Sequence, residues 1–376
     1  MNVIIIGAGI GGLTFGNLLH QSDRSIQFHI FERDAGPHSR AQGYSLTLRE
    51  PGGLTPLRQL GLYDEMKAVS SIVVNFPFLT QTGKPLLNLR DKPASPRTLR
   101  VSRDKLREVL LRDIQSSVHF NTPCLGFTER EGKPVVRLAR GREESADLVV
   151  ACDGVNSAIR QQMIGDTPTY LGISAIAGAI APAINHPLLA DNSFIMVGNG
   201  VGLFVVNENN VTAWSLSMQT RKDEFETISK AALKERAMAT IRDWCSPVPE
   251  IISTTDSETI TISRYYDKAT LTNARRGNVV MLGDAAHPMT PFRGEGANMA
   301  MVDALSLTNL LTALETNHMD ELLDRYQKEM LGRTSKAVLD SRSAALEIHT
   351  SNPFRQIIRN AKWRMVNKIL PLVQRG

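Results

Sequence analysis

The stretch NVIIIGAGIGG, residues 2–12, decides the fold of the amino-terminal part of the chain. An apolar run typical of a buried strand enters a glycine-rich turn, and an apolar segment with helical spacing follows. The turn fits the pattern G-x-G-x-x-G with Gly7, Gly9 and Gly12, and Gly11 adds one more glycine. Gly7 permits a tight turn, Gly9 lets the backbone approach a pyrophosphate, and Gly12 allows close packing of helix on strand.

A second apolar strand, over residues 26–31, ends at Glu32. In a βαβ unit that binds a dinucleotide, an acidic residue at this place accepts hydrogen bonds from the ribose hydroxyls. Strand, turn, helix and acid together predict such a unit, and the glycine positions fit FAD and NAD(P) equally well. The alternative is a glycine turn with a structural role only.

A further junction between strand and helix is GDAAHPMTPFRGEGAN, residues 283–298. It follows an apolar strand over residues 278–282 and precedes an apolar helix over residues 299–314. We expect Asp284 at the carboxyl end of that strand and free backbone N–H groups at a helix start near Gly296. The positive end of a helix dipole suits an anionic or electron-accepting ligand.

Between these two junctions lies one more, the second in chain order: an apolar strand at residues 147–152 ends in Asp153-Gly154. On its own it indicates an ordinary turn in which Asp153 caps the next segment. Glu295 is expected to be a solvent-facing or capping carboxylate.

In order and spacing, these three junctions resemble the fingerprints of the FAD-dependent aromatic hydroxylases, the class A flavoprotein monooxygenases. The segment VSRDKL, residues 101–106, also resembles the arginine-bearing helix start of that family. Within the family, the layout is most similar to that of the tetracycline-inactivating monooxygenases. The small, apolar segment at residues 172–180 lacks the polar side chains with which those enzymes clamp tetracycline, which favours a flatter or more hydrophobic ligand.

The resemblance implies a role in FAD binding for a set of residues. They are Gly7, Gly9, Gly11, Gly12, Glu32, Arg33, Arg103, Asp153, Gly154, Asp284, Pro291, Gly294, Gly296, Ala297 and Asn298. In the family, the first six positions hold the ADP half, Arg103 lies beside the ribityl and pyrophosphate groups, and Asp284 binds the ribityl hydroxyls. The residues from Pro291 onward line the isoalloxazine, and Asp153-Gly154 serves FAD and NAD(P)H together.

The implied reaction is NAD(P)H- and O2-dependent hydroxylation of an aromatic or polycyclic small molecule through a flavin C4a-hydroperoxide, as in antibiotic modification or secondary metabolism. The flavin carries the chemistry, so no catalytic acid or base is assigned, and His287 is expected to be structural. Baeyer–Villiger oxidation, epoxidation and sequestration of an aromatic compound remain alternatives. A halogenase would need a Trp-x-Trp-x-x-Pro motif, but the three tryptophans are far apart.

The expected fold is α/β. A doubly wound, Rossmann-like FAD-binding domain of the GR2 type would comprise residues 1–66, 101–165 and 268–330. An antiparallel β-sheet substrate domain, residues 67–100 and 166–267, would be interleaved with it, and residues 331–376 would form helices bridging the two. At this length, 376 residues, more than one core is expected.

Composition points to a cytoplasmic enzyme. The three cysteines have no C-x-x-C spacing, which indicates reduced thiols and no metal site. The chain shows no signal peptide and no apolar run long enough to span a bilayer. A monomer and a homodimer are equally compatible with it.

The net charge of +5 is concentrated in the last segment, where residues 353–376 contain six basic and no acidic residues. The rest of the chain carries about −1, so no nucleic-acid surface is expected. The final helix has an apolar stripe of Phe354, Ile358, Ala361, Met365, Ile369 and Val373. We expect this stripe to dock on the protein, and contact with an anionic membrane is the less favoured alternative. Trp363 falls off the stripe.

Overall fold

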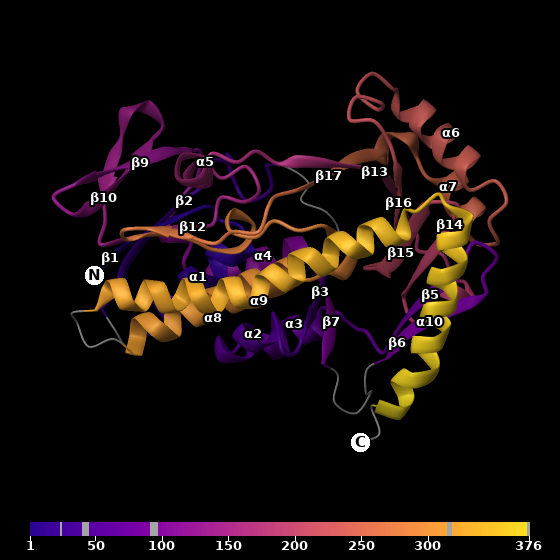
Figure 1. The fold of residues 1–376 in the computed structure, drawn as a ribbon, viewed down its shortest axis with the longest axis horizontal. Coiled ribbons are helices and arrows are strands. Elements are labelled where there is room, and N and C mark those ends of the chain that lie inside the picture. Colours follow the sequence, from indigo (N-terminus) through magenta and orange to yellow (C-terminus); the bar gives the residue numbers. More distant parts are fainter. Residues whose placement is uncertain (23–24, 40–44, 91–96, 314–317, 374–376) are drawn as a thin grey trace. The chain divides into compact units, whose positions relative to one another are not determined.

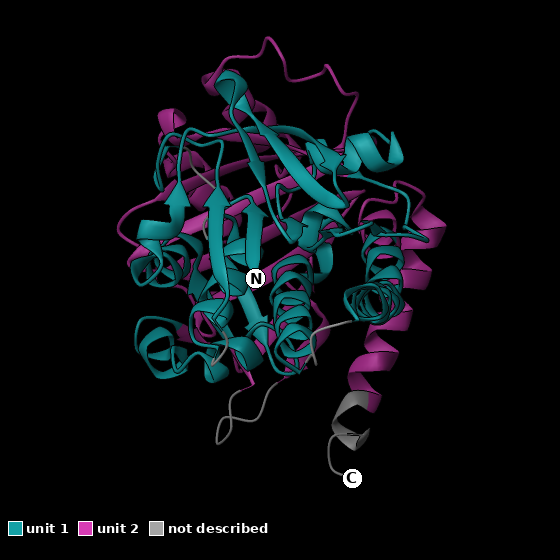
Figure 2. Cartoon of the chain, turned by 90° about the vertical axis from the view of Figure 1, so that its left-hand side faces the viewer, with its two compact units in different colours: residues 1–70, 99–169, 267–342 teal, residues 71–98, 170–266, 343–376 magenta. Residues whose placement is uncertain are grey.

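The computed structural model describes residues 1–22, 25–39, 45–90, 97–313 and 318–373. For residues 370–373 it describes the backbone but not the side chains. Two compact units alternate along the chain (Figure 2). Unit 1 contains residues 1–70, 99–169 and 267–342, and unit 2 contains residues 71–98, 170–266 and 343–376. The boundary between the last two segments falls inside one long helix, α9 (Met319–Ile348).

Unit 1 is built on a six-stranded sheet. Its order is β18 (Arg275–Arg276), β19 (Val279–Met281), β12 (Leu148–Ala151), β1 (Asn2–Ile6), β2 (Gln27–Phe31) and β8 (Val118–His119). All neighbours are parallel except β18, which is antiparallel at the edge. The central strands are buried along almost their whole length, as expected for a parallel sheet covered on both faces. The predicted α/β class is confirmed.

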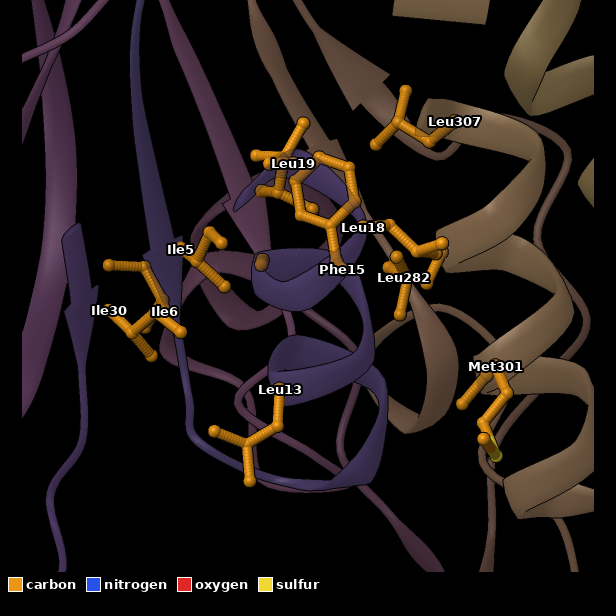
Figure 3. Close-up of a cluster of buried hydrophobic side chains, with 14 of the residues drawn as sticks. Ile5, Ile6, Leu13, Phe15, Leu18, Leu19, Ile30, Leu282, Met301 and Leu307 are labelled. Atoms are coloured by element: carbon orange, nitrogen blue, oxygen red, sulfur yellow. The ribbon is translucent and has the colours of Figure 1, made fainter. Parts of the chain in front are cut away.

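Helix α1 (Ile10–His20) packs on α4 (Arg103–Arg112) and on α8 (Gly296–Ala313). Its buried side chains, among them Leu13 and Phe15, belong to one core with β1, α8 and the end of β19 (Figure 3). This core fixes the three strand–helix junctions relative to one another, because all of them lie at the carboxyl ends of adjacent strands β1, β12 and β19.

The remaining elements of unit 1 surround this sheet. They are β3 (Ser45–Arg49), α2 (Leu54–Gln59), α3 (Tyr63–Ala68), β7 (Thr98–Ser102), β9 (Cys124–Arg130), β10 (Lys133–Leu138), β11 (Glu143–Ser145) and α5 (Ala158–Ile164). Residues 54–68 form two short helices and not one continuous helix. Gly61, with φ +71°, ends α2, and the chain restarts as α3.

Unit 2 contains a seven-stranded sheet. Its order is β17 (Thr261–Asp267), β13 (Thr169–Ile180), β16 (Val211–Gln219), β15 (Val201–Glu208), β14 (Ser193–Gly198), β5 (Asn75–Thr80) and β6 (Pro85–Arg90). A hairpin turn joins β14 to β15, and its residues Asn199 and Gly200 both have positive φ. Helices α6 (Lys230–Thr240) and α7 (Val248–Thr254) share a core with this sheet around the buried Trp214.

Helix α10 (Pro353–Val373) packs along β6 (Figure 1), but not through the predicted stripe. Phe354, Ile358 and Met365 of that stripe are exposed, whereas Trp363 is buried with its ring edge-to-face on Phe78 at 5.3 Å. The polar side of the helix docks because it can hydrogen-bond the sheet edge: Asn367 Oδ1 accepts from the N–H of Asn88 at 2.8 Å. Ile369 is exposed too, and the side chain of Val373 lies outside the described residues.

A buried histidine in unit 2 makes stability depend on pH. His349 is fully buried, its Nε2 lies 2.8 Å from Ser217 Oγ and its Nδ1 lies 2.7 Å from the carbonyl of Ala345. Burial, opposed only in part by these bonds, lowers its pKa from 6.5 to about 4. Between these values the unfolded chain binds a proton that the folded chain excludes, so stability falls as pH falls through this window.

We expect this histidine to cost the protein about 3 kcal/mol of stability between pH 6.5 and pH 4. The variant His349→Gln lacks this group and should not show this loss. The unfolding free energies of wild type and variant, measured by urea titrations across that range, should therefore come closer together as the pH is lowered. His318→Gln, at an exposed histidine, is the control and should show a constant difference. A pH-independent difference for His349→Gln would contradict the assignment.

Among the described residues, no helix is long and apolar enough to cross a membrane. Cys124, Cys152 and Cys245 are free thiols.

Candidate functional site

The first junction has the tight geometry that its glycines predict. Gly7 has φ +104°, and a Cβ there would lie 2.5 Å from the carbonyl oxygen of Cys152. A Cβ on Gly12 would lie 2.1 Å from the carbonyl oxygen of Gly7, and one on Gly11 would lie 2.8 Å from Leu282. A Cβ on Gly9, in contrast, would meet nothing within 4 Å. The turn is therefore tightly packed at Gly7, Gly11 and Gly12, and it has free space at Gly9, the N-cap of α1.

Glu32 is buried at the end of β2 and faces this turn. Its Oε2 accepts from the N–H of Ala8 at 2.7 Å, and its Oε1 accepts from the N–H of Asp34 at 2.9 Å. Each carboxylate oxygen can accept a second bond, so capacity for a hydroxyl donor remains. The neighbouring Arg33 is exposed.

Arg107, which was not predicted from the sequence, stabilises the glycine turn at residues 7–12. It is buried on α4, and its guanidinium donates to the carbonyls of Ala8 and Pro37 at 3.2 and 2.6 Å. No local pattern distinguishes this arginine from the others of α4, so sequence reasoning missed it.

The second junction, Asp153-Gly154, follows β12 directly beside Gly7. Ser157 is the N-cap of α5, and Asp153 Oδ2 accepts from the N–H of Ala158, the first residue of that helix, so Asp153 assists the cap that the sequence by itself suggested. Its Oδ1 is buried and has no hydrogen-bond partner among the described residues. Burial raises the pKa of the Asp153 carboxyl, against bonds from Ser157 and backbone amides of α5. Gly154, with φ +81°, has open space where a Cβ would be.

The third junction carries Asp284, in the short turn Gly283–Ala285 after β19. Its side chain is open to solvent and accepts no hydrogen bond from the described residues. Desolvation by the surrounding protein raises the pKa of this carboxyl, and electrostatic interactions with His287 and Arg103 oppose the shift. Because this exposed carboxylate has no hydrogen-bond donor among the described residues, a hydroxyl donor would find an unused acceptor there.

A buried cluster of charged side chains binds the turn that carries Asp284. Asp303, on α8, is fully buried and accepts from the N–H of Gly283 at 3.2 Å and from Arg333 Nη2 at 2.7 Å. His287 Nε2 lies 2.5 Å from Asp303 Oδ2. Burial raises the pKa of Asp303, but His287 and Arg333 together outweigh it and leave the pKa lowered. His287 therefore lies in a positioning network, in keeping with its expected structural role.

Arg160 binds the same turn. This fully buried arginine of α5 donates to the carbonyls of Ala286 and Ala285 at 2.6 and 3.3 Å. Its Nε and Nη2 bind the carboxylate of Asp166. The sequence did not single out Arg160 or Asp303, because burial of a charged side chain is decided by tertiary packing.

Hydrogen bonds of the Asn298 side chain connect the start of α8 to β3. Asn298 is buried, and its Oδ1 accepts from the N–H groups of Arg49 and Gly53 at 3.0 and 2.8 Å. Its Nδ2 donates to the carbonyls of Thr47 and Gly294. Both amide atoms are engaged with the backbone, so the side chain of Asn298 fixes the local structure and only its backbone remains for a ligand.

Glu295 is neither capping nor purely solvent-facing. Its Oε1 forms an ion pair of 2.8 Å with Arg49 Nη1, and Arg49 also donates to the carbonyl of Arg293. Pro291 is exposed, Gly294 takes φ +63°, and Gly296 and Ala297 are half-buried at the first turn of α8. A Cβ on Gly296 would lie 3.7 Å from Asp284 Oδ1, which places the helix start beside that carboxylate.

The predicted set thus converges within unit 1. Gly7 adjoins Asp153, Gly11 adjoins α8, Asp284 adjoins Gly296, and Arg103 at the start of α4 interacts electrostatically with Asp284. Open glycine backbone, an unpartnered buried oxygen at Asp153 and an unused carboxylate at Asp284 are features of a site that accepts an extended polar ligand.

Comparison with known proteins identifies the family of the chain. A family model described as FAD binding domain matches residues 1–341. The 3-amino-4-hydroxybenzoate 2-monooxygenase of Streptomyces cremeus is 28% identical over 93% of this chain and 88% of its own. HpxO of Klebsiella pneumoniae, solved with FAD and uric acid, has a TM-score of 0.87 at 24% identity, covering 99% of this chain and 95% of that one.

The tetracycline destructase Tet(51) also shares the fold, with a TM-score of 0.67 at 19% identity, covering 98% of this chain and 97% of that one. The match of the family model extends over most of the chain and includes all three junctions. The chain belongs to the FAD binding domain family, whose members include the FAD-dependent aromatic monooxygenases that its sequence resembles.

Proposed function

We propose that the protein is an FAD-dependent monooxygenase that uses NAD(P)H and O2 to hydroxylate an aromatic or polycyclic small molecule. The observation that carries the proposal is the convergence of three strand–helix junctions at the carboxyl ends of adjacent strands, with the exposed carboxylate of Asp284 beside the start of α8.

The glycine turn and its neighbours would hold the ADP half of FAD. The first N–H groups of α1, from Gly9 through Gly12, have no partner within the helix and suit the negatively charged pyrophosphate. Glu32 would accept from the ribose hydroxyls through its remaining lone pairs, and Arg33 lies exposed next to it. The unpartnered Oδ1 of Asp153 and the open backbone of Gly154 would face the middle of the same cofactor.

The third junction would hold the flavin end. Asp284 would accept from the ribityl hydroxyls, and Arg103 would balance its charge near the pyrophosphate. The N–H groups at Gly296 and Ala297 lie at the positive end of α8, where they would stabilise negative charge on a reduced flavin. The loop from Pro291 to Gly294, tied to Arg49, would line the ring.

When bound, FAD supplies the acceptance of hydride from NAD(P)H and the activation of O2. This chain's own residues would position the cofactor. Asp303 and Arg160 fix the turn that carries Asp284, and Asn298 fixes the start of α8. We assign no side chain as a proton donor or acceptor in the reaction.

The substrate class rests on the relatives. One acts, by its name, on 3-amino-4-hydroxybenzoate, and HpxO was solved with uric acid, so an aromatic or polycyclic ring is the ligand class we propose. We assign substrate binding to unit 2. In its strand β13, Ile176 belongs to the core, which supports packing as at least one role of this apolar segment.

The experiment that tests the function is turnover. The purified protein should be yellow, and a suitable aromatic compound should stimulate NAD(P)H oxidation and yield a product containing one oxygen atom from labelled O2. Stimulated oxidation with no oxygenated product would instead indicate a protein that sequesters the compound. A colourless protein that takes up no added FAD would refute the proposal altogether.

Asp284→Ala should weaken FAD binding roughly 10- to 150-fold, because a hydrogen bond to a charged group is worth about 1.5–3 kcal/mol. Titration of apoprotein with FAD, followed by flavin fluorescence, measures this. Asp113→Ala, at an exposed aspartate of the same unit, should leave the affinity unchanged. If Asp284→Ala bound FAD as tightly as wild type, the ribityl role of this carboxylate would be wrong.

A further inference from the structure

The outward face of α10 is apolar, whereas its inward face is polar. Trp363, Asn367 and the buried Arg359 lie toward the sheet of unit 2. Arg359 donates to the carbonyls of Glu347 and Ile348 and lies over the ring of Trp363 at 5.4 Å. This is the reverse of an ordinary surface helix, in which the apolar stripe faces the protein.

The side chains opposite that docking face are large and exposed. Phe354 is 70% exposed and Met365 is 64% exposed. Ile357, Ile358 and Ile369 are exposed as well. Their spacing of three and four residues places them on one continuous stripe along about four turns of helix. A contiguous apolar stripe of this kind marks a binding surface.

Cations flank this outward stripe on both sides. By helical periodicity, Arg364 and Lys368 lie along one edge, and Arg355 and Lys362 lie along the other. Lys362 also pairs with Glu347 on the preceding helix at 2.9 Å. Residues 353–373 contain no aspartate or glutamate. An apolar face bordered by Lys and Arg is complementary to the acyl and headgroup layers of an anionic membrane.

A second copy of this chain fits the face less well. If two α10 helices packed stripe to stripe, the arginine and lysine rows of both copies would meet, and no acidic side chain on the helix could compensate for them. We propose that the outward stripe of α10 binds the surface of an anionic lipid membrane, with the protein attached peripherally and α10 parallel to the membrane plane.

Flotation of the full-length protein with vesicles tests this proposal. Wild type should bind vesicles in which phosphatidylglycerol replaces part of the phosphatidylcholine, and should bind pure phosphatidylcholine vesicles more weakly. Arg364→Gln with Lys368→Gln should lower partitioning about 30-fold, since each cation near such a surface is worth about 1 kcal/mol. The triple variant Phe354→Ser, Ile358→Ser and Met365→Ser should lose binding to both kinds of vesicle.

Matched variants separate this effect from general charge and hydrophobicity. Arg221→Gln with Lys222→Gln removes two exposed cations elsewhere in unit 2, and Leu125→Ser removes an exposed leucine on β9. Both should bind vesicles as wild type does. Because every altered stripe residue is exposed, thermal unfolding should show that the triple variant remains folded.

Two outcomes would overturn the proposal. One is equal vesicle binding by wild type and the triple variant. The other is an absence of vesicle binding together with a dimer, seen by sedimentation equilibrium, that the triple variant abolishes. The second outcome would assign the stripe to a partner copy.

Discussion

Asp303→Ala is expected to lower the free energy of unfolding by about 3–5 kcal/mol and to impair FAD retention. Removing one partner from a buried ion pair leaves the others without compensation, and here the N–H of Gly283, His287 and Arg333 would all lose their acceptor. Urea unfolding measures the first effect, and the flavin content of the purified variant measures the second.

The control for this variant is Asp320→Ala. Asp320 also pairs with an arginine, Arg275, but its side chain is 78% exposed, so the loss should be at most about 1 kcal/mol. If Asp303→Ala were no more destabilising than this control, the charged cluster of Asp303, His287 and Arg333 would not stabilise the turn at Gly283.

Arg160→Met is expected to lower the free energy of unfolding by about 3–5 kcal/mol as well. This holds although the methionine side chain has nearly the shape of arginine without the guanidinium. The carbonyls of Ala285, Ala286 and Ala269 would each lose a buried donor, and Asp166 would keep Lys268 as its one partner among the described residues. Arg130→Met, at an exposed pair with Glu143, is the matched control. Equal unfolding free energies for the two variants would contradict the role of Arg160.

The two residues should also be coupled, because both bind backbone groups of the turn at residues 283–286. In a double-mutant cycle, the loss in Asp303→Ala with Arg160→Met should differ from the sum of the single losses by more than about 0.5 kcal/mol. Additive losses would mean that the turn is not a shared, rigid element.

Much of the fold could be predicted because it depends on local pattern. The glycine turn after β1 needs φ +104° at Gly7 and no Cβ at Gly12, and only a few sequences satisfy both requirements. Strand and helix periodicity likewise indicated the start of α8 near Gly296. Such signals are contained within a few residues.

The supporting residues could not be predicted, because their partners are distant in sequence. Arg49 meets Glu295 across 246 positions, and Arg160 meets Ala286 across 126. A charged side chain looks the same in the sequence whether it is buried or solvated. Helix α10 illustrates the same limit, since its apolar periodicity was clear but the side that faces the sheet was predicted wrongly.

By itself, the sequence determined the α/β class, the three junctions and the family resemblance, because these depend on glycine conformations and hydrophobic periods that act locally. Only the tertiary structure decided that Asp284 is accessible yet desolvated, that Asp303 and Arg160 fix its turn, and that α10 turns its apolar stripe outward. The physical reason is that desolvation and hydrogen-bond satisfaction depend on which surfaces meet, and that is settled only when distant segments pack together.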